Sequence, residues 1–223
     1  MPSSVIIAIP VFNEARFIGQ LLAEISATVA IDHILVIDDG STDATAAIAR
    51  GFGVHLIEHA QNMGKGEAMK TAFSFARQRG YRWIIFMDGD GQHLAGHLPA
   101  FLDEIGRERA DVVLGHRMDR RQMPLHRQLS NDMTSVLISL CAGVRIRDSQ
   151  CGFRAVRLSS MDGIHITAHG FQVESEMLLK LGRAGARLMH LPIRTVYGDE
   201  ASSIHLLADT LKFIKLLLKS FWW

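Results

Sequence analysis

Five short apolar runs alternate with helix-like segments over the first 115 residues, and this alternation limits the fold more than any other feature. Each run is almost continuously apolar, as in strands buried on both faces of a sheet; the runs lie at 5–9, 34–37, 54–57, 83–87 and 111–115. The segments between them carry apolar residues at helical spacing, at about 17–29, 44–50, 62–76 and 99–107. This order predicts an α/β fold with a Rossmann-like, mostly parallel sheet flanked by helices.

The second half of the chain is less regular. A basic loop at 118–127 is followed by a helix at about 128–142, a compact turn at 148–155, a helix at 171–182 and a last strand at 188–193. The tail at 204–223 has its own pattern, with Lys212, Lys215 and Lys219 on one arc of a helix and large apolar residues around the rest. The pattern and the terminal Trp222 and Trp223 suit a helix in a membrane interface. A helix packed on its own domain or on a second subunit is the alternative.

Composition excludes several classes of protein. A net charge of +1 argues against a nucleic-acid-binding protein. The two cysteines, Cys141 and Cys151, lack the spacing of metal ligands, which favours a reduced, cytoplasmic location. No apolar stretch reaches the ~18 residues of a transmembrane helix, so we expect a cytoplasmic protein, free or peripheral on the cytoplasmic face of the membrane.

The run at 83–87 ends in two acids separated by one glycine. Side chains alternate along a strand, so we expect Asp88 and Asp90 to point the same way. Two converging carboxylates repel each other unless a cation lies between them, and Mg²⁺ or Mn²⁺ bound with substrate phosphates would serve. The amide of Gln92 offers a further oxygen ligand. The alternative interpretation is a polar turn without a ligand.

Other polar residues follow the remaining strands, where ligands bind in open α/β sheets. Asp39 is placed to accept hydrogen bonds from a base or ribose, and Glu14 either does the same or serves the dipole of the next helix. Lys65, between two glycines at a helix start, marks either a phosphate contact or an exposed turn. Arg117, just past a strand, can neutralise a phosphate. The other arginines up to Arg127 read as a solvated charge run.

Together these motifs resemble a known family. In chain order they are Pro10-Val11-Phe12-Asn13-Glu14, Asp38-Asp39-Gly40-Ser41-Thr42-Asp43, Asn62-Met63-Gly64-Lys65-Gly66, Asp88-Gly89-Asp90-Gly91-Gln92-His93, Gly115-His116-Arg117 and Cys151-Gly152-Phe153-Arg154. The set is similar to glycosyltransferase family 2, in the branch of dolichyl-phosphate mannose synthases and other polyprenyl-phosphate glycosyltransferases. The resemblance extends over about 5–197.

The resemblance implies a GT-A fold, a UDP- or GDP-sugar donor, Mg²⁺ or Mn²⁺ and a polyprenyl phosphate acceptor. It implies a glycosyltransferase domain over 1–200, with a nucleotide-sugar half at about 1–117 and an acceptor half at about 118–200, before the tail helix at 201–223. By position, the implied metal ligands are Asp88, Asp90 and Gln92. The implied substrate-binding residues, with Lys65 added from its own position, are Pro10, Val11, Asn13, Glu14, Asp39, Lys65, Asp88, Gly89, Asp90, Arg117 and Arg127.

The acceptor decides whether the reaction needs a base. An anionic lipid phosphate needs no strong base, whereas a hydroxyl must lose its proton to a carboxylate. Asp148, Glu174 and Glu176 are the candidates; the expected catalytic set is Asp88, Asp90, Arg117, Asp148 and Glu174. The segment at 198–203 is acidic where the branch is basic, so a hydroxyl acceptor stays an alternative. A non-catalytic nucleotide-sugar-binding module and a homo-oligomer also stay open.

Overall fold

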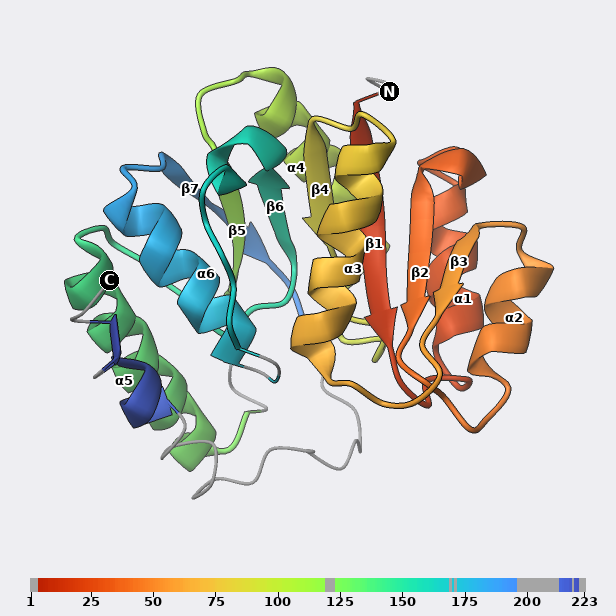
Figure 1. Ribbon diagram of the computed structural model, residues 1–223, viewed down its shortest axis with the longest axis horizontal. Helices are drawn as coiled ribbons and strands as arrows, with labels where there is room; N and C mark the ends of the chain where they lie inside the picture. Colours follow the sequence, from red (N-terminus) through yellow and green to blue (C-terminus); the bar gives the residue numbers. More distant parts are fainter. Residues whose placement is uncertain are drawn as a thin grey trace.

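A single mixed sheet forms the centre of the computed structural model, which describes residues 4–118, 123–168, 170, 172–195, 213–217, 219 and 220. Its strands are β1 (Val5–Val11), β2 (Ile34–Asp38), β3 (His55–Glu58), β4 (Trp83–Phe86), β5 (Val112–Arg117), β6 (Arg154–Arg157) and β7 (Leu188–Ile193). They lie in the order β3-β2-β1-β4-β6-β5-β7 (Figure 1). The mostly parallel α/β architecture predicted from the alternation is confirmed.

Strand β6 was not predicted. It pairs antiparallel with β4 on one side and with β5 on the other, so it interrupts an otherwise parallel sheet. The sequence analysis assigned Arg154 and Ala155 to a turn, because a four-residue strand with an arginine at each end carries no clear period. Arg154 is nevertheless fully buried, and it contributes to the site described below.

Helices cover both faces of the sheet (Figure 1). They are α1 (Ile18–Ser26), α2 (Thr45–Gly51), α3 (Lys65–Gln78), α4 (Leu98–Gly106), α5 (Leu125–Ala142) and α6 (Gln172–Arg183), with short 3-10 turns at Ile31–His33, Ala95–His97 and Leu158–Met161. The helix expected from residue 128 begins three residues earlier, directly after Pro124, whose φ of −53° suits a helix start.

The alternation of side chains along β1 explains the two apolar layers. Val5, Ile7 and Ile9 pack with α1, α2 and α4 in one buried cluster. Ile6 and Ala8 pack with α3, α5 and α6 in the other cluster. A continuous apolar run is therefore buried on both faces, and the polar residues that follow each run are left at the edge of the sheet.

The carboxyl ends of four neighbouring strands meet at one edge of the sheet. β3, β2, β1 and β4 are parallel, and Val11 at the end of β1 is in register with Asp38 at the end of β2. The backbone N–H of Asp39 also donates to the Val11 carbonyl at 2.9 Å. The loops that carry the sequence motifs therefore converge here.

The described part of the tail packs on the domain. Leu216 and Ser220 are buried, and Phe213 and Leu217 contact the same apolar cluster as α5 and α6. The rest of the tail expected as a helix at 204–223, including Lys212, Trp222 and Trp223, lies outside the described residues. Across the described residues, no helix combines the length and apolarity needed to cross a bilayer.

Candidate active site

Asp88 lies at the convergent edge, in contact with a lysine and a histidine of the chain itself. Lys65 Nζ at the start of α3 donates to Asp88 Oδ1 at 2.6 Å, and His93 Nε2 lies 3.5 Å from Oδ2. Burial would raise the pKa of Asp88, but the charge of Lys65 and the hydrogen bond from His93 outweigh it and lower the pKa below the ordinary value. The carboxylate is therefore ionised at neutral pH.

Lys65 connects segments that lie far apart in the chain. Its ammonium lies 2.9 Å from Glu174 Oε1 at the start of α6, and Arg154 of β6 lies 3.3 Å from the same oxygen. Burial opposes the charge on Lys65, yet Asp88 and Glu174 raise its pKa above the ordinary value. The side chain predicted as a substrate contact or an exposed lysine thus forms an internal ion-pair network.

Two glycines allow the backbone to approach this network. A Cβ at Gly152 would lie 2.0 Å from Asp88 Oδ2, and a Cβ at Gly89 would lie 2.5 Å from Val11 Cγ1. Any side chain at Gly152 would therefore displace the Asp88 carboxylate. Gly89 brings the acidic turn against the end of β1, beside Pro10 and Val11, which were predicted to hold the nucleoside.

Asp90 and Gln92 lie in the turn after β4 and are half-buried. Because β4 ends at Phe86, the alternation of a strand does not reach Asp88 and Asp90, and the argument that both point the same way does not apply. The N–H of Gln92 donates to Asp90 Oδ1 at 3.0 Å. Asp90, Gln92 and Asp88 offer oxygen ligands, which fit Mg²⁺ or Mn²⁺.

Within the described ranges, no group of three or more His, Cys, Asp or Glu side chains could hold a metal by itself. A hard cation here would therefore complete its coordination from the phosphates of a donor, as Mg²⁺ commonly does. One oxygen of Asp88 is already bound by Lys65. Asp90 Oδ1 likewise accepts a hydrogen bond from the Gln92 N–H, and Asp88, Asp90 and Gln92 all stay predicted ligands.

Asp39 is buried and accepts hydrogen bonds from the chain. His59 Nδ1 contacts Oδ1 at 2.7 Å, and the backbone N–H groups of Met63 and Gly64 donate at 3.0 and 2.7 Å. These bonds fix the turn that precedes Lys65. The contact of Asp39 with a base or ribose stays a prediction, since both oxygens of this carboxylate already accept hydrogen bonds within the chain.

Asn13 and Glu14 hold two loops together at the end of β1. The Asn13 side-chain oxygen accepts from the Thr42 N–H at 2.8 Å, and the Asn13 N–H donates to Ser41 Oγ at 2.8 Å. The Glu14 N–H donates to Thr45 Oγ1 at 2.8 Å. Asn13 has a φ of +58°, a conformation that asparagine tolerates better than most residues. These hydrogen bonds join the loop after β1 to the loop after β2.

Arg117, at the end of β5, forms a two-pronged ion pair with Asp148. Nε donates to Oδ2 at 2.8 Å and Nη2 to Oδ1 at 2.9 Å. Burial would raise the pKa of Asp148, but the hydrogen bonds and charge of Arg117 lower it below the ordinary value. Burial raises the pKa of the neighbouring Cys151 thiol to about 12. Cys151 is therefore an unreactive side chain of the core.

Two predicted residues lie apart from this network. Glu176 is fully buried on α6 and accepts from Lys180 Nζ at 2.6 Å and from the Thr167 and Ala168 backbone. Arg127 lies half-buried in the first turn of α5. The segment at 198–203 and residues 119–122 of the basic loop are outside the described residues. Sequence reasoning missed the roles of Arg154 and His93, although both lie inside the motifs that it identified.

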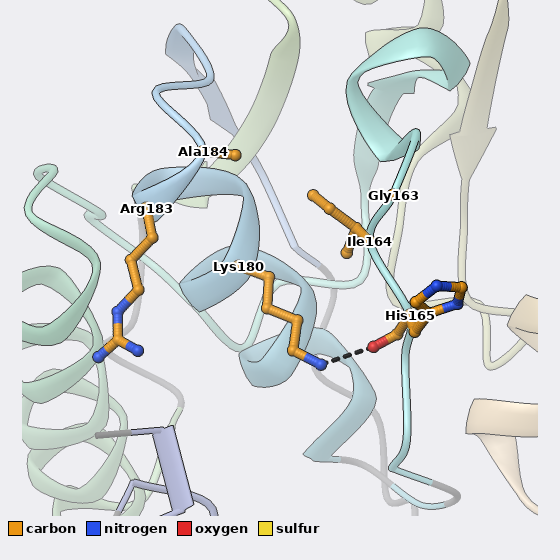
Figure 2. A pocket seen from close by; sticks show the side chains of 6 residues that line it. All are labelled: Gly163, Ile164, His165, Lys180, Arg183 and Ala184. Atoms are coloured by element: carbon orange, nitrogen blue, oxygen red, sulfur yellow. Dashed lines mark hydrogen bonds between the residues drawn. The ribbon is translucent and has the colours of Figure 1, made fainter. Parts of the chain in front are cut away.

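A cavity of about 400 Å³ lies elsewhere, between α6 and the segment before it (Figure 2). It is lined by Gly163, Ile164, His165, Lys180, Arg183 and Ala184. Lys180 Nζ points to the His165 carbonyl at 2.5 Å and also pairs with Glu176. None of the predicted site residues lines this cavity, so we assign the site to the convergent strand ends.

Sequence comparison identifies the family. The sequence model of glycosyl transferase family 2 matches residues 6–179. This chain belongs to glycosyltransferase family 2. The resemblance found in the motifs is therefore confirmed, and the protein is a glycosyltransferase of that family.

Several relatives cover nearly the whole chain. An uncharacterized protein of Methanocaldococcus jannaschii is 33% identical over 224 residues, 95% of this chain and 96% of that protein. The undecaprenyl-phosphate mannosyltransferase of Micrococcus luteus is 29% identical over 89% of this chain and 86% of its own length. The polyprenol monophosphomannose synthase of Mycolicibacterium smegmatis is 27% identical over 84% of this chain and 76% of its own.

The fold also matches solved structures. Glucosyl-3-phosphoglycerate synthase from Mycobacterium tuberculosis, in complex with Mn²⁺ and uridine-diphosphate-glucose, gives a TM-score of 0.74 over 97% of this chain and 78% of that one. The identity is 19%, so the likeness concerns the fold. The predicted GT-A fold is confirmed.

Proposed function

We propose that this protein is an inverting, metal-dependent glycosyltransferase that moves a sugar from a nucleotide-sugar to a polyprenyl phosphate. One observation carries the proposal: each carboxylate considered as a base is already paired within the chain. Asp148 is paired with Arg117, Glu174 with Lys65 and Arg154, and Glu176 with Lys180. A site arranged in this way suits an acceptor that needs no deprotonation.

A lipid phosphate is such an acceptor because its oxygen is anionic at neutral pH. Its oxygen would attack the anomeric carbon from the face opposite the nucleoside diphosphate, forming a new carbon–oxygen bond. The bond to the diphosphate breaks, and its electron pair leaves with the diphosphate. Configuration at the anomeric carbon is inverted, and no proton has to be removed. The names of the two polyprenyl-phosphate relatives support this acceptor class.

The donor would lie along the ends of β1, β2 and β4. The nucleoside would lie beside Pro10 and Val11 at the end of β1. The loops joined by Asn13 and Glu14, and Asp39 with its turn, would border it on the other sides. Asp88, Asp90 and Gln92 would hold Mg²⁺ or Mn²⁺. When bound, the cation would offset the charge that develops on the leaving diphosphate. Arg117, oriented by Asp148, would place its positive charge near the diphosphate or the sugar.

The acceptor tests this proposal directly. Purified protein is incubated with UDP- and GDP-sugars, Mn²⁺ and either a short polyprenyl phosphate or the matching polyprenol, and products are identified by mass spectrometry. We expect transfer to the phosphate and at least about 100-fold less to the alcohol, the smaller end of what a general base contributes. Equal transfer to the alcohol would support the hydroxyl-acceptor alternative, and binding without transfer to either would support a non-catalytic module.

The metal role is tested by calorimetric titration of the same donors with Mn²⁺ and then with EDTA. Asp90→Ala should abolish metal-dependent donor binding while the circular dichroism spectrum stays unchanged. Asp103→Ala on the exposed side of α4 is the matched control and should bind donor normally. Unchanged donor affinity of Asp90→Ala in Mn²⁺ would refute the assignment of Asp90 as a ligand.

A polyprenyl acceptor resides in the bilayer, so we also propose peripheral attachment to the cytoplasmic face of a membrane. The tail at 204–223 was predicted to provide it. Phe213, Leu216 and Leu217 of that tail pack on the domain, so their apolar surface is already used within the chain.

A further inference from the structure

Lys65 is shared by two carboxylates that differ in their access to solvent. Its ammonium lies 2.6 Å from Asp88 Oδ1 and 2.9 Å from Glu174 Oε1. The side chain of Asp88 is 26% exposed, whereas that of Glu174 is only 5% exposed. An ion or ligand that arrives from solvent therefore meets Asp88 first, while Glu174 stays enclosed by protein.

Arg154 fixes Glu174 independently of Lys65. Arg154 Nη2 lies 3.3 Å from Glu174 Oε1 and also donates to the Cys151 carbonyl, and no part of the Arg154 side chain is exposed. Glu174 therefore remains a charged partner for Lys65 when Asp88 is engaged elsewhere. It follows that Lys65 can release Asp88 Oδ1 without becoming a buried and unpaired cation.

The charges of this cluster balance one another. The carboxylates of Asp88 and Glu174 face the cations of Lys65 and Arg154. A divalent cation bound at Asp88 adds positive charge close to the Lys65 ammonium, and like charges repel each other strongly in a partly buried place. In the part of the chain that the structure describes, no cluster of three or more acidic, histidine or cysteine side chains offers a metal a site by itself. The negative diphosphate of a donor would offset this excess of positive charge.

We propose that Lys65 is a resident cation: it keeps Asp88 Oδ1 occupied in the ligand-free protein, so that Mg²⁺ or Mn²⁺ binds tightly only together with the donor diphosphate. The inference rests on the proposed function, because it concerns the metal and the donor of the same site. Lys65 is then a positioning residue, which acts on the reaction through Asp88. Since the two binding free energies are linked, the donor strengthens metal binding by the same factor as the metal strengthens donor binding.

The first test measures Mn²⁺ binding to the full-length chain without donor, from the electron paramagnetic resonance signal of free Mn²⁺. We expect weak binding to the wild type. Lys65→Met removes the competing charge but keeps a side chain of similar length, and it should bind Mn²⁺ at least about tenfold more tightly. Lys70→Met is the matched control, because Lys70 lies on the same helix and pairs with Glu67 at 2.8 Å, and it should bind Mn²⁺ as the wild type does.

Two further variants separate the charge of Lys65 from its packing. Lys65→Arg keeps the positive charge and should bind Mn²⁺ as weakly as the wild type does. Glu174→Gln keeps the shape of the side chain but leaves Lys65 with Asp88 as its only carboxylate in the cluster. The Mn²⁺ concentration that restores binding of UDP-glucose or GDP-mannose after EDTA treatment, measured by calorimetry, should then be about tenfold higher than for the wild type. This variant tests the proposal even where Lys65→Met does not fold.

The two charge changes should thus act in opposite directions, which a merely structural role would not produce. Unchanged Mn²⁺ binding in Lys65→Met, or an unchanged Mn²⁺ requirement in Glu174→Gln, would overturn the proposal. So would tight donor-free binding in the wild type or in Lys65→Arg. A wild type that transfers sugar with Mn²⁺, while Lys65→Met binds no more Mn²⁺ than the wild type, refutes this inference alone. A wild type without metal-dependent donor binding refutes the proposed metal role as well.

Discussion

The side chains at the strand ends and those on the outer face of α5 differ in whether they have partners within the chain. At the strand ends, polar residues contact one another: Asp88 with Lys65, Asp39 with the Gly64 turn, and Asp148 with Arg117. On α5, five large apolar residues are exposed, and we call them the α5 stripe: Leu125, Leu129, Met133, Val136 and Leu140. The first region is expected to be rigid and costly to alter, whereas the second should tolerate change without loss of fold.

The contrast shows that conspicuous motif residues serve structure as well as ligands. Lys65 occupies one oxygen of Asp88 and also holds Glu174, so a substitution there removes the charge that two carboxylates share. Residues of the α5 stripe have no comparable internal task. Three predictions follow this contrast, from the strand ends to the α5 face.

The largest effect is expected at Lys65. Lys65→Met leaves Asp88 and Glu174 as buried carboxylates without their shared cation, and we expect a loss of about 3 kcal/mol in the free energy of unfolding. Lys70→Met on the same helix removes an i,i+3 pair with Glu67 and should cost about 0.5 kcal/mol or less. Urea unfolding of both variants measures the difference. Similar losses for the two variants would show that the network at Lys65 is not the stabilising feature inferred here.

An intermediate effect is expected at Asp148. Asp148→Asn removes a buried charge-assisted pair and should cost about 2 kcal/mol at pH 7. Because the folded pKa of Asp148 is lowered, its stabilising contribution is present above the unfolded pKa of about 3.9 and is lost as pH falls through the folded pKa. The difference in the free energy of unfolding between wild type and Asp148→Asn should therefore become smaller from pH 7 to pH 3, as measured by urea unfolding. If this difference in the free energy of unfolding stays constant from pH 7 to pH 3, the ion pair between Asp148 and Arg117 does not stabilise the fold as inferred.

The smallest effect is expected on the α5 stripe. Leu129→Ser should change the free energy of unfolding by less than about 0.5 kcal/mol, as is usual for exposed positions. Ile138→Ala, on the buried face of the same helix, should cost about 2–4 kcal/mol. Thermal unfolding of the two variants provides the measurement. A large loss for Leu129→Ser would mean that another part of this chain covers the stripe.

Much of the domain could be predicted from local signals. Continuous apolar runs identified the strands of the parallel half, because a strand buried on both faces must be apolar throughout. The order of the motifs identified the family, and their positions after the strands identified the edge at which the site lies. The short β6 was missed, since four residues with Arg154 at one end give no period to recognise.

The chemical tasks of individual residues could not be predicted in the same way. From their positions, Lys65 was expected to contact a phosphate, Asp39 to bind a nucleoside and Glu174 to take a proton. In the structure each of these side chains has a partner within the chain. Each partner lies at least 20 positions away in the sequence, so no local pattern reveals the pairing.

The sequence by itself determined the α/β class, the family and the set of residues gathered at the strand ends. These depend on local apolar patterning and on the order of short motifs, which a linear chain displays. Tertiary structure decided which charges neutralise one another and which apolar face of α5 is left uncovered. Those outcomes depend on distances between segments far apart in the chain, and such distances exist only once the sheet has brought the segments together.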